Sequence, residues 1–492
     1  MKSVDNQTLD VAIIGAGFAG LGAAIRLQQA GYESFVIFER AAEVGGTWRD
    51  NVYPGCACDV PSHLYSFSFE PNPNWSRMFS PQPEILAYLK SCVNKYKLQE
   101  KIQFNTEVQV CRFDEQSGYW TLQTSAAELV QARVVVSAIG PLNRPNIPQF
   151  KGLSNFKGAV FHSSQWNQHE SLHHKRVAVI GTGASAIQII PSIAPDVQKL
   201  VVFQRTAPWV APRPDRMASA FEKKLFRQFP FLQWSLRSLI YWILELRGTG
   251  LLGNRWIHAL NKKISLNHIK ESIQDPKLQQ KVIPTYEYGC KRIVISSDYY
   301  PALSRQNVQL VTDSISEISE NSILTANGVE YPVDVIVLST GFVAAEINVN
   351  QQIFGLGGRE LIQEWREKGA QAYLGTAVSG FPNLFFLVGP NSGIGHNSII
   401  HIIESQVNYV VDYLKTLKNR QDGAYMNLRL GVQEVYNQQL QHDLKDTVWA
   451  SGCQSWYLTA TGKNTTIWPH LNSKLRHMTK RVKLSDFDLV KY

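Results

Sequence analysis

"DVAIIGAGFAG", residues 10–20, is the stretch that decides the fold class of this chain, because it occurs a second time as "RVAVIGTGASA" at residues 176–186. Each copy is a short apolar run typical of a buried parallel strand, followed by glycines and then by a stretch with helical periodicity. A second apolar strand follows in both units, "FVIF" in the first and "LVVF" in the second. The order strand, helix, strand therefore occurs twice, at an offset of 166 residues, from position 10 to position 176.

Two such units predict two α/β domains, because 492 residues are too many for one hydrophobic core. Apolar segments at 133–140 and 334–342 are expected to be the last strands of the two units. Between the second glycine motif and the strand at 334–342 lies a segment with helical periodicity that is rich in Trp, Phe, Leu and basic residues. The predicted division is a first domain at 1–141 and 342–492, a second domain at 142–212 and 290–341, and a helical insertion at 213–289.

The composition narrows the class of protein. Hydrophobic residues make up 44% and charged residues 18% of the chain, as in ordinary folded proteins. The net charge of +9 is spread without a Lys/Arg block, so we expect no nucleic-acid partner. The six cysteines lack CxxC spacing, which predicts reduced thiols and no metal site. The polar N-terminus and the lack of an apolar run of ~18 residues predict neither a signal peptide nor a spanning helix, and hence a cytoplasmic location.

The first glycine motif is Gly15-x-Gly17-x-x-Gly20, between an expected strand and an expected helix. In such a motif the first glycine permits a tight turn, the second lets the backbone approach a pyrophosphate, and the third allows close packing of strand and helix. The next strand ends in Glu39, a carboxylate placed to accept hydrogen bonds from ribose hydroxyls. This unit predicts a dinucleotide site; a tight turn packed against a helix is the alternative.

The second motif is Gly181-x-Gly183-x-x-Ala186, with the alanine variant of the third position. Its second strand ends in Gln204, Arg205 and Thr206 instead of an acid. A carboxylate there would repel a 2′-phosphate, whereas an arginine and a hydroxyl would bind one. We therefore predict an α/β fold with two Rossmann-like dinucleotide-binding domains, one for FAD and one for NADPH, and a helical insertion. The alternative is that Arg205 is a plain surface cation.

Between the two motifs, "FKGAVFHSSQW" contains Phe156, Gly158, His162 and Trp166. With this pattern the sequence resembles the class B flavoprotein monooxygenases, most closely the Baeyer–Villiger monooxygenases, whose fingerprint is FxGxxxHxxxW followed by Pro or Asp. The resemblance extends over nearly the whole chain, through "EVGGTW", "YPGCACDVPS", "VFQRT", "GCKR", "STGF" and "FPNLFF". The chain departs from the fingerprint at Asn167, where the family has Pro or Asp.

The resemblance implies further site residues. The implied cofactor contacts are Gly46, Thr47, Trp48, Asp59 and Tyr65 on the flavin side, and Ser185, Lys291 and Trp456 on the NADP side, with Lys291 at the 2′-phosphate. Arg292 matches the family's active-site arginine and Asp59 the acid beside it, which makes them the candidate catalytic residues. The fingerprint residues are thought to couple domain movement to cofactor binding. A solvated basic pair at Lys291 and Arg292, and a turn-capping Asp59, are the structural alternatives.

The activity that the resemblance implies is an FAD-dependent, NADPH-consuming monooxygenase that inserts one oxygen atom of O2 by way of a flavin C4a-peroxide. The expected reaction is Baeyer–Villiger oxidation of a lipophilic ketone to an ester or lactone. Three alternatives stay open: an N- or S-oxygenating flavin monooxygenase, a flavin disulfide reductase using a cysteine pair such as Cys56-x-Cys58, and a non-catalytic NADP(H) sensor.

The insertion has an unusual pattern at residues 223–247. Apolar residues nearly encircle a helix expected at 234–246, and basic residues flank it: Lys223, Lys224, Arg227, Arg237 and Arg247. The favoured interpretation is a buried helix. The alternative is a lid for lipophilic substrates that also makes a peripheral contact with a membrane.

Overall fold

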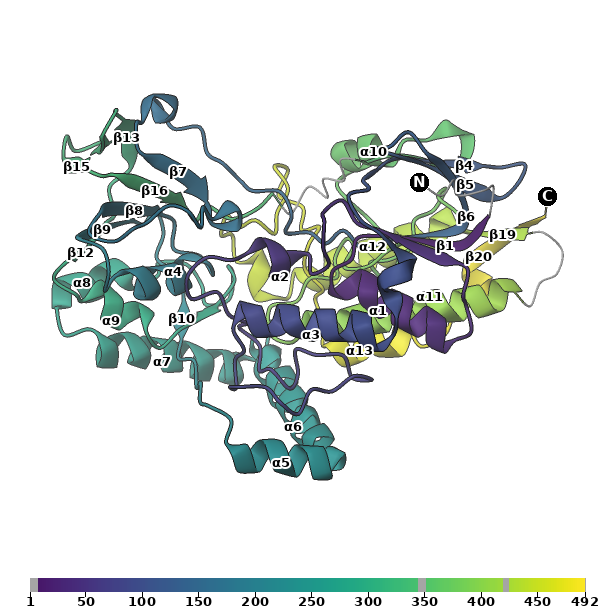
Figure 1. The fold of residues 1–492 in the computed structure, drawn as a ribbon, viewed down its shortest axis with the longest axis horizontal. Helices are drawn as coiled ribbons and strands as arrows, with labels where there is room; N and C mark the ends of the chain where they lie inside the picture. Colours follow the sequence, from purple (N-terminus) through teal and green to yellow (C-terminus); the bar gives the residue numbers. More distant parts are fainter. Residues whose placement is uncertain (1–7, 344–350, 419–423, 492) are drawn as a thin grey trace.

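The computed structural model describes residues 8–343, 351–418 and 424–491. The first sheet, on the right of Figure 1, has the strand order β17-β4-β5-β6-β1-β2-β3, with β18 beside β6. Its strands are β1 (Leu9–Ile14), β2 (Phe35–Phe38), β3 (Ile102–Gln103), β4 (Val108–Asp114), β5 (Tyr119–Thr124), β6 (Leu129–Ser137), β17 (Gln352–Phe354) and β18 (Leu384–Phe386). β1 pairs in parallel with β2 and β6, whereas β4, β5 and β6 form antiparallel pairs.

The second sheet, on the left of Figure 1, has five strands, all parallel, in the order β12-β9-β8-β16-β7. These strands are β7 (Ala159–His162), β8 (Arg176–Ile180), β9 (Lys199–Phe203), β12 (Val308–Val311) and β16 (Val335–Leu338). The chain thus forms this sheet from segments on both sides of the helical insertion. The predicted domain boundaries stay predictions, but all five strands lie between the boundaries at 141/142 and 341/342.

The strands that precede the two glycine motifs have matching places in the two sheets. β1 and β8 each lie between two parallel neighbours, and Val11, Ile13, Val177 and Val179 have no solvent exposure. Strands covered on both faces need such continuous apolar runs, which is why the pattern was readable from the sequence. After the glycines come α1 (Phe18–Gln29) and α4 (Ala186–Ile193). The predicted α/β fold class is confirmed.

The remaining elements complete the two sheet-based units. The longest helix in the described part of the chain is α11 (Ile399–Lys418), and it packs on α1. The others are α2 (Thr47–Asp50), α3 (Gln82–Lys95), α9 (Tyr299–Leu303), α10 (Leu361–Lys368), α12 (Leu430–Leu444), α13 (Asn472–Met478), β10 (Val210–Ala211), β11 (Val294–Ile295), β13 (Ile315–Ile318), β14 (Ser322–Thr325), β15 (Glu330–Pro332), β19 (Ala424–Leu428) and β20 (Phe487–Lys491).

The insertion is helical, as predicted, and consists of α5 (Ala220–Gln228), α6 (Pro230–Gly248), α7 (Arg255–Ser272) and α8 (Pro276–Val282). In Figure 1, α5 and α6 project from the lower edge of the molecule. The expectation of a buried apolar helix is wrong for α6, because its buried residues are Gln233, Arg237, Tyr241, Glu245 and Gly248, most of them polar. None of the helices in the described part of the chain has the length and apolar character needed to cross a membrane.

Hydrogen bonds, rather than apolar packing, hold the first half of α6 against the first domain. Gln233 lies with its Nε2 atom 3.1 Å from Nδ1 of His63, and Arg237 donates from Nη1 to the carbonyl oxygen of His63 over 2.7 Å. His63 is 5% exposed. Burial, with a smaller contribution from nearby Arg216 and Arg237, lowers the pKa of His63 to about 4, although Glu222 opposes the shift.

This histidine should make the stability of the protein sensitive to acid. The folded pKa lies below the unfolded value of about 6.5, so the unfolded chain takes up the proton first and the free energy of unfolding falls as the pH drops from about 6.5 to about 4. The full loss is of the order of 3 kcal/mol. His63→Asn, which keeps an acceptor for Gln233, should flatten this part of a plot of melting temperature against pH. His169→Asn, at an exposed position, is the control, and an unchanged slope in His63→Asn would contradict the assignment.

Candidate active site

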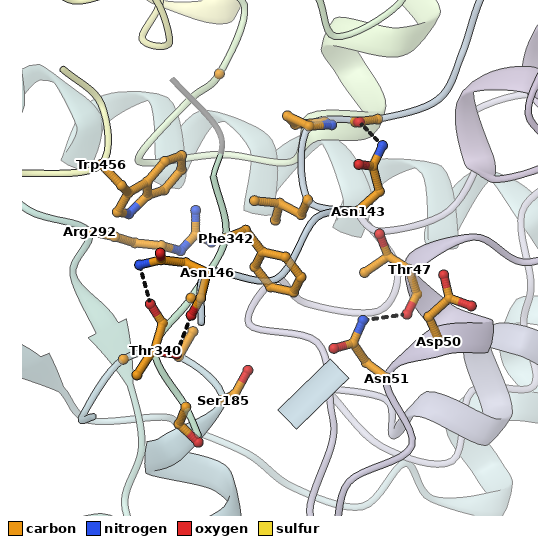
Figure 2. Close-up of a pocket in the computed structure, with 18 of the residues that line it drawn as sticks. Thr47, Asp50, Asn51, Asn143, Asn146, Ser185, Arg292, Thr340, Phe342 and Trp456 are labelled. Carbon is orange, nitrogen blue, oxygen red and sulfur yellow. Dashed lines mark hydrogen bonds between the residues drawn. The ribbon is translucent and has the colours of Figure 1, made fainter. Parts of the chain in front are cut away.

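The two glycine loops open into one cavity of about 1240 Å³. Most of the residues predicted from the sequence line it: Gly15, Gly17, Glu39, Gly46, Thr47, Trp48, Asp59, Tyr65, Gly181, Gly183, Ser185, Arg205, Thr206, Lys291, Arg292 and Trp456. Figure 2 shows part of this cavity, with Trp456 and Arg292 on one side and Thr47 and Asn51 on the other. Residues far apart in the chain therefore meet because the loops after β1 and β8 face the same space.

Each glycine of the first loop is required for a different structural reason. Gly15 has a φ of +103°, and a Cβ atom there would lie 2.8 Å from the carbonyl oxygen of Ala138. A Cβ atom at Gly20 would lie 1.8 Å from the carbonyl oxygen of Gly15, so only glycine lets α1 pack this closely on the loop. At Gly17, by contrast, the nearest atom would be 3.8 Å away. This space at the start of α1 fits a pyrophosphate held by backbone N–H groups.

Glu39 ends β2 at the wall of the cavity and is buried. Its carboxylate accepts hydrogen bonds from the backbone N–H groups of Ala16 (2.8 Å) and Ala41 (3.0 Å) and from Nη1 of Arg49 (3.0 Å). A carboxylate offers about four acceptor positions, so these bonds orient the group and leave about one position for a ribose hydroxyl. The placement fits the first nucleotide as the sequence predicted.

Two of the residues expected on the flavin side, Trp48 and Tyr65, lie in contact at α2. Nε1 of Trp48 donates to the hydroxyl of Tyr65 over 3.1 Å, and the two rings meet edge to face with centroids 5.6 Å apart. Burial raises the pKa of Tyr65, so this hydroxyl stays protonated. Asn51 donates from Nδ2 to the carbonyl oxygen of Thr47 over 2.9 Å, which holds Thr47 at the cavity wall (Figure 2).

The second glycine loop repeats this geometry. Gly181 has a φ of +111°, and a Cβ atom there would lie 2.3 Å from the carbonyl oxygen of Ser339. A Cβ atom at Gly183 would meet nothing within 4 Å, so the backbone is open to the cavity at this point. Ser185 precedes α4 and also lines the cavity. The loop thus fits a second pyrophosphate.

At the end of β9, a neutral side chain takes the position that an acid has at the end of β2. Gln204 is buried and donates from Nε2 to the carbonyl oxygen of Lys281 over 2.7 Å, so it fills the place of the acid without adding charge. Arg205 is exposed, and burial together with the charge of Arg205 lowers the pKa of Lys291. Both cations line the cavity, where an anion would offset their mutual repulsion. The pair fits a 2′-phosphate.

Arg292 and Asp59 come together from the two sheet-based units. Nη2 of Arg292 donates to Oδ2 of Asp59 over 2.5 Å, and the negative charge of Asp59 raises the pKa of Arg292. Both side chains are partly exposed to the cavity, at 35% and 29%. The structural alternatives of a solvated basic pair and a turn cap do not account for this contact, since neither requires residues 233 positions apart to meet.

The loop that carries Asp59 docks on α4, a contact that the sequence analysis missed. Gln188 of α4 accepts from the hydroxyl of Tyr53 (3.1 Å) and donates to the carbonyl oxygen of Ala57 (2.9 Å). Gly55 has a φ of +79°, and a Cβ atom there would lie 2.6 Å from the carbonyl oxygen of Gln188. "YPGCACD" therefore needs its glycine for a close approach between domains, which brings Asp59 to Arg292.

Two segments that cross between the units also meet at the cavity. Thr340 donates from Oγ1 to the carbonyl oxygen of Asn146 over 2.5 Å, and Asn146 donates from Nδ2 to the carbonyl oxygen of Thr340 over 3.4 Å (Figure 2). Neither residue was singled out from the sequence, although the prolines around Asn146 mark a connecting segment.

The cysteines differ from the sequence expectation. Cys290 and Cys453 form a disulfide with Cα atoms 6.2 Å apart, which corrects the expectation that all cysteines are reduced. Spacing could not reveal this pair, because 163 residues separate its members. The bond joins the segment of Lys291 and Arg292 to the segment of Trp456. Burial raises the pKa of Tyr457, the neighbour of Trp456, to about 12; the charge of Asp59 adds to the shift and that of Arg292 opposes it.

Cys56 and Cys58 bear on the disulfide-reductase alternative. Both line the cavity, and both are free and buried. Burial raises the pKa of Cys56 to about 11, whereas a redox-active pair needs a readily formed thiolate. No group of His, Cys, Asp and Glu within the described ranges is arranged to hold a metal ion.

The fingerprint residues lie behind the cavity wall rather than in it. Nε2 of His162 lies 3.0 Å from the carbonyl oxygen of Gly341, in the segment that leaves β16. Trp166 packs edge to face on Phe161, and a Cβ atom at Gly158 would lie 2.1 Å from the carbonyl oxygen of Asp334. This placement agrees with an indirect role at the segment that connects the units.

Asn167, the departure from the fingerprint, caps a turn. Its Oδ1 atom accepts a hydrogen bond from the backbone N–H of His169 over 3.1 Å. Aspartate, which the family pattern allows at this position, makes the same kind of turn. The departure therefore leaves the local geometry intact.

Comparisons with known proteins agree with this site. Residues 8–355 match the family described as Flavin-binding monooxygenase-like. The chain belongs to this family. A Baeyer–Villiger monooxygenase of Pseudomonas aeruginosa is 48% identical over 481 residues, covering 97% of this chain and 91% of the relative. A Baeyer–Villiger monooxygenase of Streptomyces coelicolor is 44% identical over 487 residues, covering 99% and 93%.

A solved structure, described as the OTEMO complex with FAD and NADP, superimposes with a TM-score of 0.87 at 29% identity. It covers 98% of this chain and 99% of that one. The expected resemblance to Baeyer–Villiger monooxygenases, the class of enzyme and the pair of cofactors are thereby confirmed. The roles of the individual site residues remain proposals.

Proposed function

We propose that this flavin-binding monooxygenase catalyses the NADPH-dependent Baeyer–Villiger oxidation of a ketone to an ester or lactone. The reaction consumes ketone, O2, NADPH and a proton, and yields ester, NADP+ and water. The observation that carries the proposal is the ion pair of Arg292 and Asp59 at the cavity into which both glycine loops open. Within this pair, Arg292 supplies a guanidinium that stays protonated, beside the space for both cofactors.

The residues at the cavity would hold the two cofactors in different ways. The first loop, with Gly17 at the start of α1 and Glu39 at the end of β2, would hold the pyrophosphate and ribose of FAD. The second loop would hold the pyrophosphate of NADPH, and Arg205, Thr206 and Lys291 would hold its 2′-phosphate. When bound, FAD would take hydride from NADPH and supply the activated oxygen.

Arg292 would stabilise the charge that develops on the ketone. When oxygen adds to the carbonyl carbon, negative charge moves to the former carbonyl oxygen, and a fixed cation beside that atom lowers the barrier. Arginine is suited to this role because it stays protonated, and Asp59 raises its pKa further. Asp59 acts as a positioning residue, since its contact is with Arg292.

The proposal extends to the type of substrate, the cellular location and contact with a membrane. A lipophilic substrate is supported by the apolar residues of the cavity wall, such as Ile394, Ile399 and Ile403. We also propose a cytoplasmic location and a peripheral membrane contact through residues 223–247. An open route from bilayer to cavity would suit a ketone that dissolves poorly in water.

The deciding experiment is product analysis. Purified protein is incubated with NADPH, isotopically labelled O2 and a mixed panel of ketones, amines and sulfides, and the products are identified by mass spectrometry. We expect esters or lactones that carry one labelled oxygen atom. N-oxides or sulfoxides without any ester would support the N- or S-oxygenating alternative. A colourless protein without flavin would support the NADP(H) sensor.

A further inference from the structure

The helix α6 buries polar side chains and exposes apolar ones: Gln233, Arg237 and Glu245 are buried against the protein, whereas most of its large apolar side chains face outward. We infer that its outer face, formed by Phe231, Trp234, Leu239, Trp242, Ile243 and Leu246, docks on an anionic membrane surface. Each of these side chains is between 46% and 66% exposed. The inference deepens the proposed function, on which its role in substrate supply rests.

The inner face of α6 accounts for why the outer face is free. Arg237 donates to the carbonyl oxygens of His63 (2.7 Å) and Leu64 (3.2 Å). Glu245, 1% exposed, accepts from Nδ2 of Asn397 over 2.8 Å. A buried charge that is hydrogen-bonded in this way keeps the helix in one rotation about its axis. The apolar residues on the opposite side therefore cannot turn inward.

The outer face is part of a larger concentration of exposed apolar groups. Half of the large hydrophobic side chains that are exposed in the described part of the chain belong to residues 217–260. Beyond α6 they include Phe221 on α5, at 74% exposure, and Trp256 on α7, at 88%. A folded protein rarely leaves so many Trp and Phe rings in water without a partner, and these rings are the ones preferred at membrane interfaces.

The charges around this surface select an anionic partner. Residues 220–263 contain two acids, and neither is a free surface charge: Glu222 forms an ion pair with Arg216, and Glu245 is buried. The exposed charged residues of the same stretch are all basic: Lys224, Arg227, Arg247, Arg255 and Lys263. Aromatic and basic side chains together are characteristic of helices that lie on anionic lipid surfaces.

A second copy of the chain fits this surface less well. A two-fold symmetric contact would bring the same patch of each copy together, and neither acid of residues 220–263 is free to pair with the basic residues of the other copy. An anionic bilayer satisfies both the apolar and the basic groups.

The docking surface is connected to the cavity by direct contacts. Asn397, the partner of Glu245, lines the cavity. The ring of Tyr241 on the inner face of α6 lies 4.7 Å from that of His401, two residues before the cavity residue Ile403. A membrane bound to the outer face of α6 would thus lie against the element that supports one wall of the cavity, which suits delivery of a lipophilic ketone.

The test is flotation of the full-length protein with lipid vesicles. Wild-type protein should float with vesicles that contain phosphatidylglycerol and much less with phosphatidylcholine alone. Trp242→Glu/Leu246→Glu, on the outer face, should lower binding at least about tenfold. Lys224→Gln/Arg247→Gln should lower binding at low salt by about fivefold for each cation removed. The matched control is Leu430→Glu/Val435→Glu on α12, at two similarly exposed apolar positions, and it should bind as wild type does.

Two further measurements separate the possible outcomes. Oxidation of a water-soluble ketone without vesicles should be unchanged in Trp242→Glu/Leu246→Glu, whereas the KM for a long-chain ketone supplied in vesicles should rise. Failure of the wild type to oxidise any ketone would refute the proposed function and leave the flotation result standing. The docking inference is overturned if wild type does not bind anionic vesicles, if the double glutamate variant binds equally well, or if sedimentation shows a dimer that this variant dissociates without any lipid binding.

Discussion

Arg292→Ala is expected to lower ester formation at least ~10²-fold, the usual cost of losing one group that stabilises a developing oxyanion. Reduction of bound flavin by NADPH should survive, because the proposed phosphate contacts belong to Arg205 and Lys291. Oxygen should still be consumed, with hydrogen peroxide appearing in place of ester. The measurements are anaerobic stopped-flow reduction and the yields of ester and peroxide under air.

The Arg292 prediction has two useful comparisons. Asp59→Ala should show the same pattern in a milder form, since Asp59 positions Arg292 through their 2.5 Å contact. Arg305→Ala, at an exposed arginine outside the cavity lining, should behave as wild type. Wild-type amounts of ester from Arg292→Ala would refute the assigned role, and loss of flavin reduction in the same variant would show that Arg292 acts in NADPH binding instead.

Arg205→Ala/Lys291→Ala is expected to raise the KM for NADPH at least about 100-fold while changing the KM for NADH little. Each charge-assisted contact to a phosphate contributes about 1.5–3 kcal/mol, and NADH lacks the 2′-phosphate. The pair is informative because both side chains line the cavity, at the end of β9 and beside Arg292.

Steady-state kinetics with both nucleotides checks the cofactor prediction. Gln204→Glu should also weaken the binding of NADPH. This change would place a carboxylate at the end of β9, the position that corresponds to Glu39 at the end of β2 in the first unit. Equal losses for NADPH and NADH in Arg205→Ala/Lys291→Ala would refute a 2′-phosphate site at this position.

Local pattern was enough for the architecture. Strands such as β1 and β8 are buried on both faces and must be apolar throughout, and the glycines follow them at short, recognisable spacing. The resemblance then assigned Arg292, Asp59 and Lys291 to a common site, and the structure brings them to one cavity. Gln188 escaped notice because its partners, Tyr53 and Ala57, lie more than 130 positions away along the chain.

One prediction that was wrong concerns the burial of the helical insertion. Its sequence is apolar on most sides, which favoured burial, yet α6 turns Arg237 and Glu245 inward and its tryptophans outward. Hydropathy describes each side chain separately. Which face of a helix is buried depends also on whether its charged side chains have hydrogen-bond partners in the folded protein. His63, Leu64 and Asn397 supply those partners, and nothing in the sequence near α6 indicates them.

The sequence by itself determined the two strand–glycine–helix units, the helical nature of the insertion and the family, because these depend on residue types at short spacing. Only the tertiary structure decided which distant groups meet: Asp59 with Arg292, Cys290 with Cys453, and the inner face of α6 with the first domain. Such contacts depend on how the two sheets and the insertion pack in three dimensions. That packing is set by the sum of many weak, long-range contacts, which no short stretch of sequence contains.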